Sequence, residues 1–354
     1  MRILLIQYQM LGDVLTSTII ADQLKITYPQ ARLDYLIVSH AEALVAHHPA
    51  IDGLIKVSKS DFEKMSFIIS LSRKLKQKKY DLLIDAYGKN NSAILSFLSR
   101  AKQRIGYKKW FSVFAYTHTV RNEPDTSIYK TGVALGSRML LTQPLTDHVK
   151  WHLKPKIYLT KSEIEEGKNW IKASGIDLET PLTMVSVLGS SDVKTLPFNT
   201  MAKVLDEFVA HTKSQLLFNY IPHQKDAALT IYNACSPATR ELIFIDAFAP
   251  SIRDFLKVLS HCDSIIGNEG GAVNMGKALD IATFTIFSPW INKSSWNVGE
   301  DGKKHISVHL KDFKPELYQE KPLKKMKPQA LELYQKFEAK LVFPELKKFT
   351  KENY

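Results

Sequence analysis

The chain has 354 residues and a formal charge of +12, from 48 Lys and Arg against 36 Asp and Glu. This length predicts two domains of about 100–200 residues each, and a content of 45% hydrophobic and 24% charged residues excludes a disordered chain. The two cysteines, Cys235 and Cys262, form no CxxC pair, and no apolar run reaches the ~18 residues of a membrane-spanning helix, so we expect a protein of the reducing cytoplasm without a disulfide framework.

The first half of the chain alternates short apolar runs with segments of helical spacing. The run at residues 2–7 is typical of a buried parallel strand, and residues 14–26 place their apolar side chains on one helical face. The predicted strands are 2–7, 33–38, 54–57 and 80–85, and the predicted helices are 14–26, 61–78 and 92–99. This alternation indicates a doubly wound parallel sheet.

The same pattern restarts after a connecting segment at residues 142–156. The predicted helices are 161–174, 199–211, 224–234, 251–261, 273–279 and 327–340, and the predicted strands are 182–187, 215–219, 242–245, 264–267 and 282–287. We therefore expect an α/β protein with two Rossmann-like domains, residues 1–155 and 156–320, a cleft between them, and a C-terminal helical segment at 321–354.

Two strand-to-helix junctions suggest binding sites without proving them. Gly12-Asp13 follows the first strand, where ligands bind in open parallel sheets, although Asp is also a common helix cap. In residues 188–197 the hydroxyls of Ser190 and Ser191 and the ammonium of Lys194 suit a phosphate group. This is not a Walker loop, and a plain surface turn fits the second segment almost as well.

The third junction is the sequence Gly-Asn-Glu-Gly-Gly at residues 267–271. Gly270 and Gly271 let a ligand approach the backbone closely, and the helix that follows favours a diphosphate at its N-terminus. A tight turn also needs glycine, but Glu269 beside two glycines favours a nucleotide-sugar site.

The order and spacing of these three motifs resemble glycosyltransferase family 9, the ADP-heptose:lipopolysaccharide heptosyltransferase family, which has the GT-B fold. The resemblance runs from Arg2 to about Pro289 and includes residues 80–85 and 104–107. It implies an inverting transfer of heptose from ADP-heptose to a sugar hydroxyl, with one general base and a stabilised leaving diphosphate. In GT-B proteins the last helix crosses back to the N-terminal domain, which is the expectation for segment 321–354.

The resemblance also implies roles for single residues. Asp13 matches the catalytic base of the family. The residues that match its donor-binding positions are Ser190, Ser191, Lys194, Gln224, Glu269, Gly270, Gly271 and Asn274. The base and ribose of the donor are expected near residues 219–224 and 247–250.

Three donor-side residues depart from the usual family pattern. Glu269, Asn274 and Gln224 stand where the family usually has Asp, His and Glu. The donor sugar therefore stays open, with ADP-heptose first and another nucleotide sugar as the alternative. The sequence has no Asp-x-Asp, so we expect neither a metal of the GT-A kind nor a cofactor.

The basic excess is concentrated in two segments. Residues 73–130 hold 13 basic and 4 acidic side chains and residues 303–354 hold 13 and 7, whereas residues 131–302 hold 16 and 18. The charge thus falls on the predicted acceptor side, where Gly12, Lys89, Arg104 and Lys108 are candidate contacts to an anionic glycolipid such as a lipopolysaccharide core, with peripheral contact to the cytoplasmic face of the inner membrane. The basic tail also fits simple solubilisation.

Two functions of other classes also fit parts of the sequence. A non-catalytic α/β protein that binds an anionic polymer would use the charge but leave the glycine motifs without a role, and no nucleic-acid-binding motif accompanies the charge. A sugar-nucleotide epimerase would keep the fold but usually needs more than one carboxylate or His in its site. We therefore expect no nucleic-acid partner.

Overall fold

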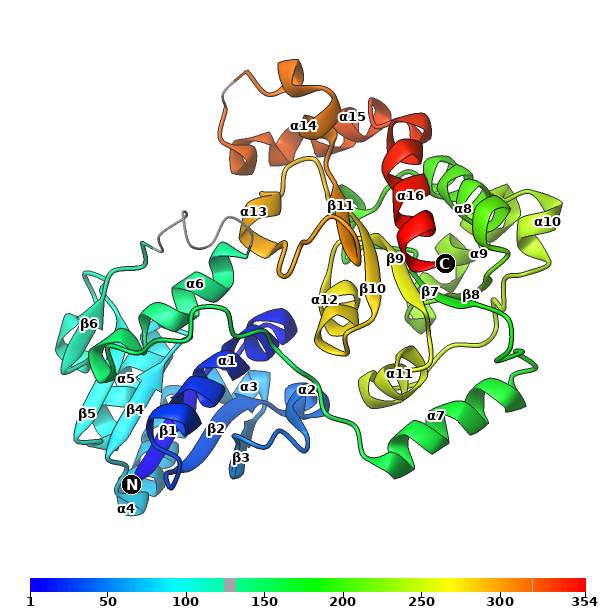
Figure 1. The fold of residues 1–354 in the computed structure, drawn as a ribbon. Helices are drawn as coiled ribbons and strands as arrows, with labels where there is room; N and C mark the ends of the chain where they lie inside the picture. Colours follow the sequence, from blue (N-terminus) through cyan, green and yellow to red (C-terminus); the bar gives the residue numbers. More distant parts are fainter. Residues whose placement is uncertain (124–131, 320) are drawn as a thin grey trace. The chain divides into compact units, whose positions relative to one another are not determined.

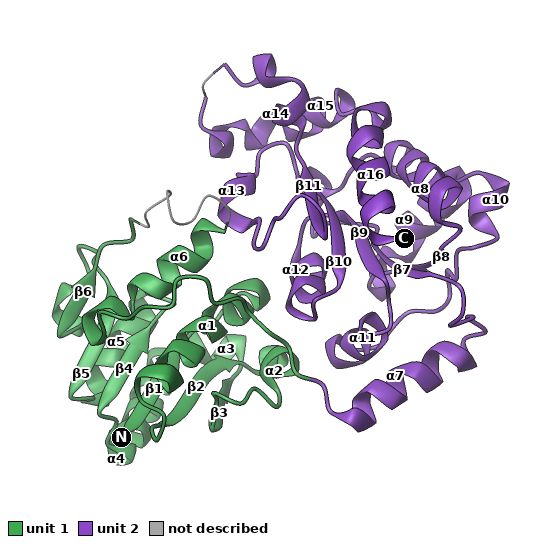
Figure 2. Ribbon diagram, viewed as in Figure 1, with its two compact units in different colours: residues 1–158 green, residues 159–354 purple. Residues whose placement is uncertain are grey.

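The computed structural model describes residues 1–123, 132–319 and 321–354. It divides into two compact units, Met1–Tyr158 and Leu159–Tyr354 (Figure 2). The change of unit lies three residues beyond the expected boundary at 155. Each unit has its own parallel sheet with helices around it (Figure 1).

In the described part of unit 1 the sheet has six parallel strands in the order β3-β2-β1-β4-β5-β6. The strands are β1 (Arg2–Ile6), β2 (Arg32–Val38), β3 (Gly53–Val57), β4 (Leu82–Asp85), β5 (Gln103–Tyr107) and β6 (His118–Val120). The helices are α1 (Leu11–Thr27), α2 (Glu42–Val45), α3 (Lys59–Phe62), α4 (Met65–Lys78), α5 (Asn90–Ser99) and α6 (Val133–Leu140). The apolar run of β1 forms the centre of the core because helices and neighbouring strands cover it on all sides.

Two features of unit 1 differ from the sequence prediction. The expected helix at 61–78 is split between α3 and α4, because Phe62 turns inward and stacks on Tyr8 with ring centroids 4.3 Å apart. The strands β5 and β6 extend the sheet beyond the four strands that were predicted. β5 contains the polar residues Gln103 and Arg104 and therefore lacks the continuous apolar run of a central strand.

Over the described residues of unit 2, the sheet has five parallel strands in the order β11-β10-β9-β7-β8. The strands are β7 (Leu182–Ser186), β8 (Gln215–Phe218), β9 (Ser264–Asn268), β10 (Ala282–Ile286) and β11 (His305–Val308). The longer helices are α7 (Lys161–Ala173), α8 (Phe198–Thr212), α9 (Lys225–Ala234), α11 (Ile252–Leu259), α12 (Gly271–Ala278) and α16 (Ala339–Asn353). Short helices are α10 (Pro237–Arg240), α13 (Lys293–Trp296), α14 (Leu310–Phe313) and α15 (Ala330–Gln335).

The predicted strand at 242–245 is wrong. This segment makes only an isolated bridge, in which Ile243 pairs with Leu216 of β8. It follows directly on α10 and runs into Asp246 and then Pro250, residues that strands disfavour.

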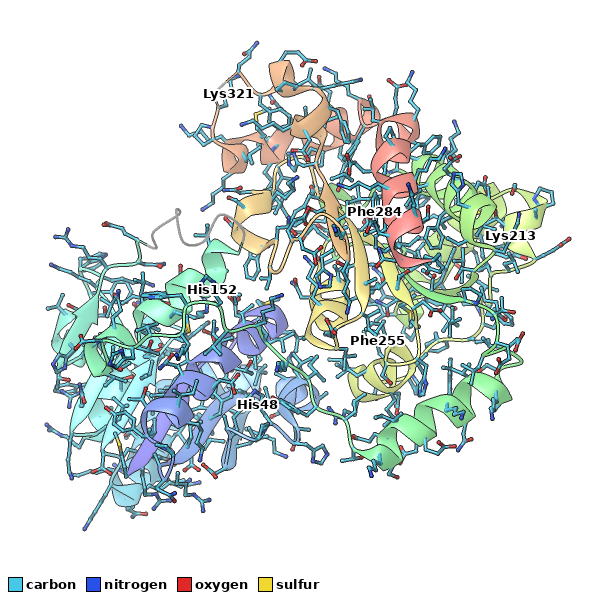
Figure 3. All side chains as sticks on the ribbon, in the orientation of Figure 1. His48, His152, Lys213, Phe255, Phe284 and Lys321 are labelled. Carbon is cyan, nitrogen blue, oxygen red and sulfur yellow. The ribbon has the colours of Figure 1, made fainter. Side chains whose placement is uncertain are left out.

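The C-terminal segment ends in α16, which begins where the predicted helix 327–340 was expected to end. Pro328 falls in a 3₁₀ turn, since proline disrupts the interior of an α-helix. The α16 side chains Val342, Leu346 and Phe349 are fully buried in the core of unit 2, and the Phe349 ring lies 5.6 Å from that of Phe284. Phe284 is labelled on β10 in Figure 3. Segment 321–354 therefore belongs to unit 2, where α16 packs beside α8.

Within residues 1–123, 132–319 and 321–354, no helix is long and apolar enough to span a bilayer.

Candidate functional site

The turn between β9 and α12 brings the third motif to the carboxyl edge of the unit 2 sheet. Gly267 has φ +121°, and a Cβ there would lie 2.5 Å from the carbonyl oxygen of Ser186, so only glycine fits. Gly276, in the second turn of α12, lets this helix approach β9, because a Cβ would lie 2.5 Å from Cγ2 of Ile265. The free N–H groups of the first α12 turn, which begins at Gly271, therefore point beyond the sheet edge.

Asn268 ties the Ser190 segment to this turn. Its fully buried side chain accepts a hydrogen bond from the Leu196 N–H at 2.8 Å and donates to the carbonyl oxygens of Ser186 and Val187 at 3.0 and 2.9 Å. Leu196 and Asn268, 72 positions apart in sequence, thus hold the second and third motifs at one sheet edge. The sequence analysis gave Asn268 no role, because spacing does not reveal a side chain that bridges two loops.

Lys194 and Glu269 form the charged pair of this edge. The Lys194 ammonium lies 3.4 Å from Oε1 of Glu269, too poorly aligned for a hydrogen bond, and 5.9 Å from the ring centroid of Trp290. Burial raises the pKa of Glu269, whose side chain is 10% exposed, and Lys194 counters part of that shift. Glu269 thus holds a cation beside the N-terminus of α12, an arrangement that suits an anionic ligand.

The other predicted donor residues differ in the exposure and the hydrogen bonding of their side chains. Ser190 and Ser191 are exposed, and Asn274 is half-buried in the first turn of α12. The Gln224 side chain is engaged, because Nε2 donates to the carbonyl oxygen of Gly189 at 3.2 Å and Oε1 accepts from the Ile221 N–H. Gln224 therefore holds the Ser190 loop in place.

The two segments expected around the base and ribose lie together. Asn219 and residues 247–249 line one small cavity of about 10 Å³, enough for one water. Phe248, which is 37% exposed, has its ring centroid 5.7 Å from that of Tyr220. A partly exposed aromatic side chain at this place is suited to stacking a planar base.

Asp13 occupies the first turn of α1, directly beyond the carboxyl end of β1 in unit 1. Its Oδ2 accepts a hydrogen bond from the N–H of Met10 at 3.3 Å, so the capping role is present. Its Oδ1 is paired with the guanidinium of Arg138 on α6, which also donates from Nε to Oγ of Ser17 at 3.2 Å. The Asp13 side chain is 26% exposed and that of Arg138 12%, so the carboxylate is fixed in direction yet accessible.

A pocket of about 420 Å³ opens at the same edge of unit 1. It is lined by side chains from the segments after β1, β4 and β5 and from α3, namely Tyr8, Gln9, Phe62, Glu63, Tyr87, Lys89, Asn90, Asn91, Lys109 and Phe111. Burial chiefly raises the pKa of Tyr87, and the neighbouring Tyr8, Asp85 and Asp13 add to the shift. The pocket combines aromatic side chains with polar amides, two lysines and the carboxylate of Glu63, a lining that suits a sugar with anionic groups.

The predicted acceptor residues divide between pocket and scaffold. Gly12 adjoins Asp13 in the first turn of α1, and Lys89 lines the pocket. Lys108 is exposed outside it, while Arg104 donates from its guanidinium to the carbonyl oxygens of Ala115 and Ala101 at 2.9 and 2.7 Å. Lys109 lines the pocket although the sequence analysis did not select it, and burial chiefly lowers its pKa.

Comparisons with known proteins identify the family. A family model described as glycosyltransferase family 9 (heptosyltransferase) matches residues 68–327. The chain belongs to glycosyltransferase family 9. Over 97 residues it is 29% identical to lipopolysaccharide heptosyltransferase 3 of Escherichia coli K12, a match that spans 27% of this chain and 28% of that relative.

Two solved structures share the fold of this family member. A glycosyltransferase family 9 protein from Veillonella parvula superposes with a TM-score of 0.75 at 17% identity, over 95% of this chain and 97% of the other. The E. coli ADP-heptose lipopolysaccharide heptosyltransferase II superposes with a TM-score of 0.69 at 15% identity, over 95% and 100%. The predicted family, GT-B fold class and enzyme class, glycosyltransferase, are thereby confirmed.

The sequence analysis missed one important residue of unit 1, Arg138. Arg138 fixes the direction of the Asp13 carboxylate, but 125 positions separate the two residues. Arg138 lies on a short helix that the sequence analysis did not predict. No local spacing could have paired the two residues, since only the fold brings α6 beside α1.

Proposed function

We propose that this chain is an inverting glycosyltransferase that moves a sugar, in the first place heptose from ADP-heptose, to a hydroxyl of an anionic glycolipid such as a lipopolysaccharide core. In this proposal unit 2 binds the nucleotide sugar and unit 1 binds the acceptor. The observation that carries it is the cation Lys194, held by Glu269 beside the N-terminus of α12. Family membership and the name of the solved E. coli ADP-heptose heptosyltransferase II support the choice of donor.

The donor would lie along the carboxyl edge of the unit 2 sheet. The diphosphate would accept hydrogen bonds from the first α12 N–H groups at Gly271 and from the hydroxyls of Ser190 and Ser191, with Lys194 balancing its charge. The adenine would stack on the ring of the partly exposed Phe248. No metal or cofactor is required in this proposal, because backbone dipoles and one lysine neutralise the leaving group.

The reaction is a single displacement. The acceptor hydroxyl oxygen forms a bond to the anomeric carbon while the bond from that carbon to the diphosphate oxygen breaks, and the configuration inverts. The Asp13 carboxylate takes the hydroxyl proton, and the diphosphate leaves with the bonding electron pair. Lys194 and the α12 N-terminus stabilise the charge that develops on that oxygen.

The acceptor would enter the pocket at the carboxyl edge of unit 1. Its aromatic wall, with Tyr8 and Tyr87 rings 5.5 Å apart edge to face, suits a sugar ring. Its lysines Lys89 and Lys109 suit phosphate or carboxylate groups on the glycan. With a glycolipid acceptor, we propose that the reaction takes place in the cytoplasm, at the surface of the inner membrane.

A different nucleotide sugar is the second candidate donor. The Gln224 amide, expected near the ribose, is occupied by the backbone of Gly189 and Ile221. This chain therefore offers the ribose a different surface from the carboxylate that the family usually has there.

A donor screen tests the proposal. Nucleoside diphosphate release is measured with ADP-, GDP- and UDP-sugars, each with and without a lipopolysaccharide-core acceptor. We expect acceptor-dependent release of ADP from ADP-heptose, and a Lys194→Ala variant that binds ADP more weakly. Acceptor-dependent release from a GDP- or UDP-sugar alone would establish the alternative donor, and release from none of them would refute the proposed reaction.

A further inference from the structure

Large apolar side chains protrude from one loop of unit 1. We call residues 108–115, between β5 and β6, the aromatic loop. Trp110 is 92% exposed, Phe114 60% and Val113 51%. Exposing apolar side chains of this size to water costs free energy, and a group of them on one surface marks an interaction site.

The aromatic loop is held firmly although its tip is exposed. Ser112 is buried and donates from Oγ to the carbonyl oxygen of Tyr107 at 3.2 Å, and Arg104 donates to the buried Ala115. The adjoining Tyr116 donates to the buried carboxylate of Asp85 at 2.7 Å. Fixed inner residues thus present Trp110 and Phe114 outward, so the exposure of these two rings is built into the fold.

The surroundings of the aromatic loop are basic. Residues 86–122 contain seven Lys and Arg and no Asp or Glu. The exposed members are Lys89, Arg100, Lys102, Lys108 and Arg121. Of these Lys102 is paired with Asp81 at 2.7 Å, outside the segment, and the others keep the positive field around the loop.

This combination fits a lipid bilayer of anionic headgroups. Tryptophan prefers the boundary between headgroups and acyl chains, where its ring is buried and its N–H stays wet. Lysine and arginine beside such a ring are attracted by the negative surface potential of anionic lipid. A protein partner could bury the apolar tip whatever the charge around it. The absence of acidic residues over the 37 positions 86–122 therefore favours an anionic membrane.

We propose that the aromatic loop docks unit 1 on an anionic membrane surface, with Trp110 and Phe114 inserted at the headgroup level and the flanking cations on lipid phosphates. The loop follows β5, and parallel strands end at one edge, so it shares that edge with Asp13 and the acceptor pocket. If the proposed function holds, docking delivers a lipid-anchored acceptor to that pocket directly from the bilayer.

The test measures vesicle binding by the full-length protein without donor or acceptor. Vesicles of phosphatidylcholine with or without phosphatidylglycerol are sedimented with wild type, Trp110→Ala, Lys108→Ala and the control Leu331→Ala. Leu331 is 55% exposed on unit 2, so it matches the loss of an exposed apolar side chain elsewhere. We expect binding to phosphatidylglycerol vesicles that falls about 10- to 100-fold in Trp110→Ala and about fivefold in Lys108→Ala, with wild-type binding in Leu331→Ala.

Other outcomes overturn the proposal. Equal vesicle binding by wild type and Trp110→Ala, or no binding by wild type, would exclude the aromatic loop as a membrane surface. Light scattering of the same samples gives the oligomeric state. If the wild type does not bind vesicles but forms a dimer that Trp110→Ala abolishes, the loop contacts a second copy of this chain instead of a membrane. Because no sugar is transferred in this assay, failure of the proposed reaction leaves its result unchanged.

Discussion

Replacing Arg138 by Met removes the group that orients Asp13 while keeping most of the side-chain volume. The pair is intermediate between exposed and buried, since the two side chains are 12% and 26% exposed. Exposed pairs contribute about 0–1 kcal/mol and broken buried pairs cost about 3–5 kcal/mol, so we expect a stability loss of about 1–2 kcal/mol. In a unit of this size that loss lowers Tm by roughly 2–8 °C.

Arg138→Met acts on turnover through the direction of the Asp13 carboxylate, which loses its partner on α6. A reacting group displaced by about 1 Å loses up to 100-fold in rate. We therefore expect kcat to fall by about 10- to 50-fold with the KM for the donor unchanged.

A double-mutant cycle with Asp13→Asn separates positioning from a general structural effect. If Arg138 acts through Asp13, Arg138→Met costs activity in the wild type and adds almost nothing in the Asp13→Asn background. Steady-state rates of nucleoside diphosphate release, with thermal melting of all four proteins, give both quantities. Equal losses of kcat in the two backgrounds would refute the positioning role.

Three further changes test the donor site and the packing. Lys194→Ala should weaken ADP binding by about 10- to 100-fold, because a charge-assisted contact is lost, while the exposed control Lys203→Ala keeps the wild-type affinity in isothermal titration. Gly276→Ala should lower the free energy of unfolding by about 1–2 kcal/mol, because the clash of the added Cβ outweighs the gain in helix propensity. The control Gly271→Ala, whose Cβ would meet no atom nearer than 3.8 Å, should change it by no more than ~0.5 kcal/mol in urea unfolding. Similar losses in both variants would contradict the packing argument. Burial lowers the pKa of His48 (Figure 3) to about 4, below its unfolded value, so its stabilising contribution is present above pH 6.5 and is lost as pH falls toward 4. His48→Leu should therefore reduce the loss of unfolding free energy between pH 7 and 4.5 by roughly 2–3 kcal/mol. The same pH dependence of the unfolding free energy in wild type and variant would show that His48 does not titrate in this way.

The sequence predicted the fold wherever apolar runs were long. The run that became β1 and the restart of the pattern in the second half located both sheets, because buried parallel strands are apolar throughout. The outer parts of the sheets were harder to predict. β5, next to the edge strand β6, was missed because Arg104 interrupts its apolar pattern, and residues 242–245 were predicted as a strand although they make only one bridge.

The site was predictable in its glycine motifs and unpredictable in its supports. Glycine at 267 and 276 is set by local backbone geometry, which leaves a trace in the sequence. The bonds of Asn268 to Leu196 and of Arg138 to Asp13 join segments that are distant in sequence and that only the folded chain brings together. Arg104 was expected to face the acceptor from its charge alone, but its guanidinium is hydrogen-bonded to backbone carbonyls.

The most direct test of the proposed mechanism is the Asp13→Asn variant, measured for turnover and for donor binding. If Asp13 takes the acceptor proton, loss of its carboxylate should lower kcat by about 100- to 10,000-fold, while isothermal titration gives the wild-type Kd for ADP, because the nucleotide is assigned to unit 2. Thermal melting within a few degrees of the wild type would show that the fold is kept. Wild-type turnover by Asp13→Asn would contradict the assigned base and with it the reaction proposed for this chain.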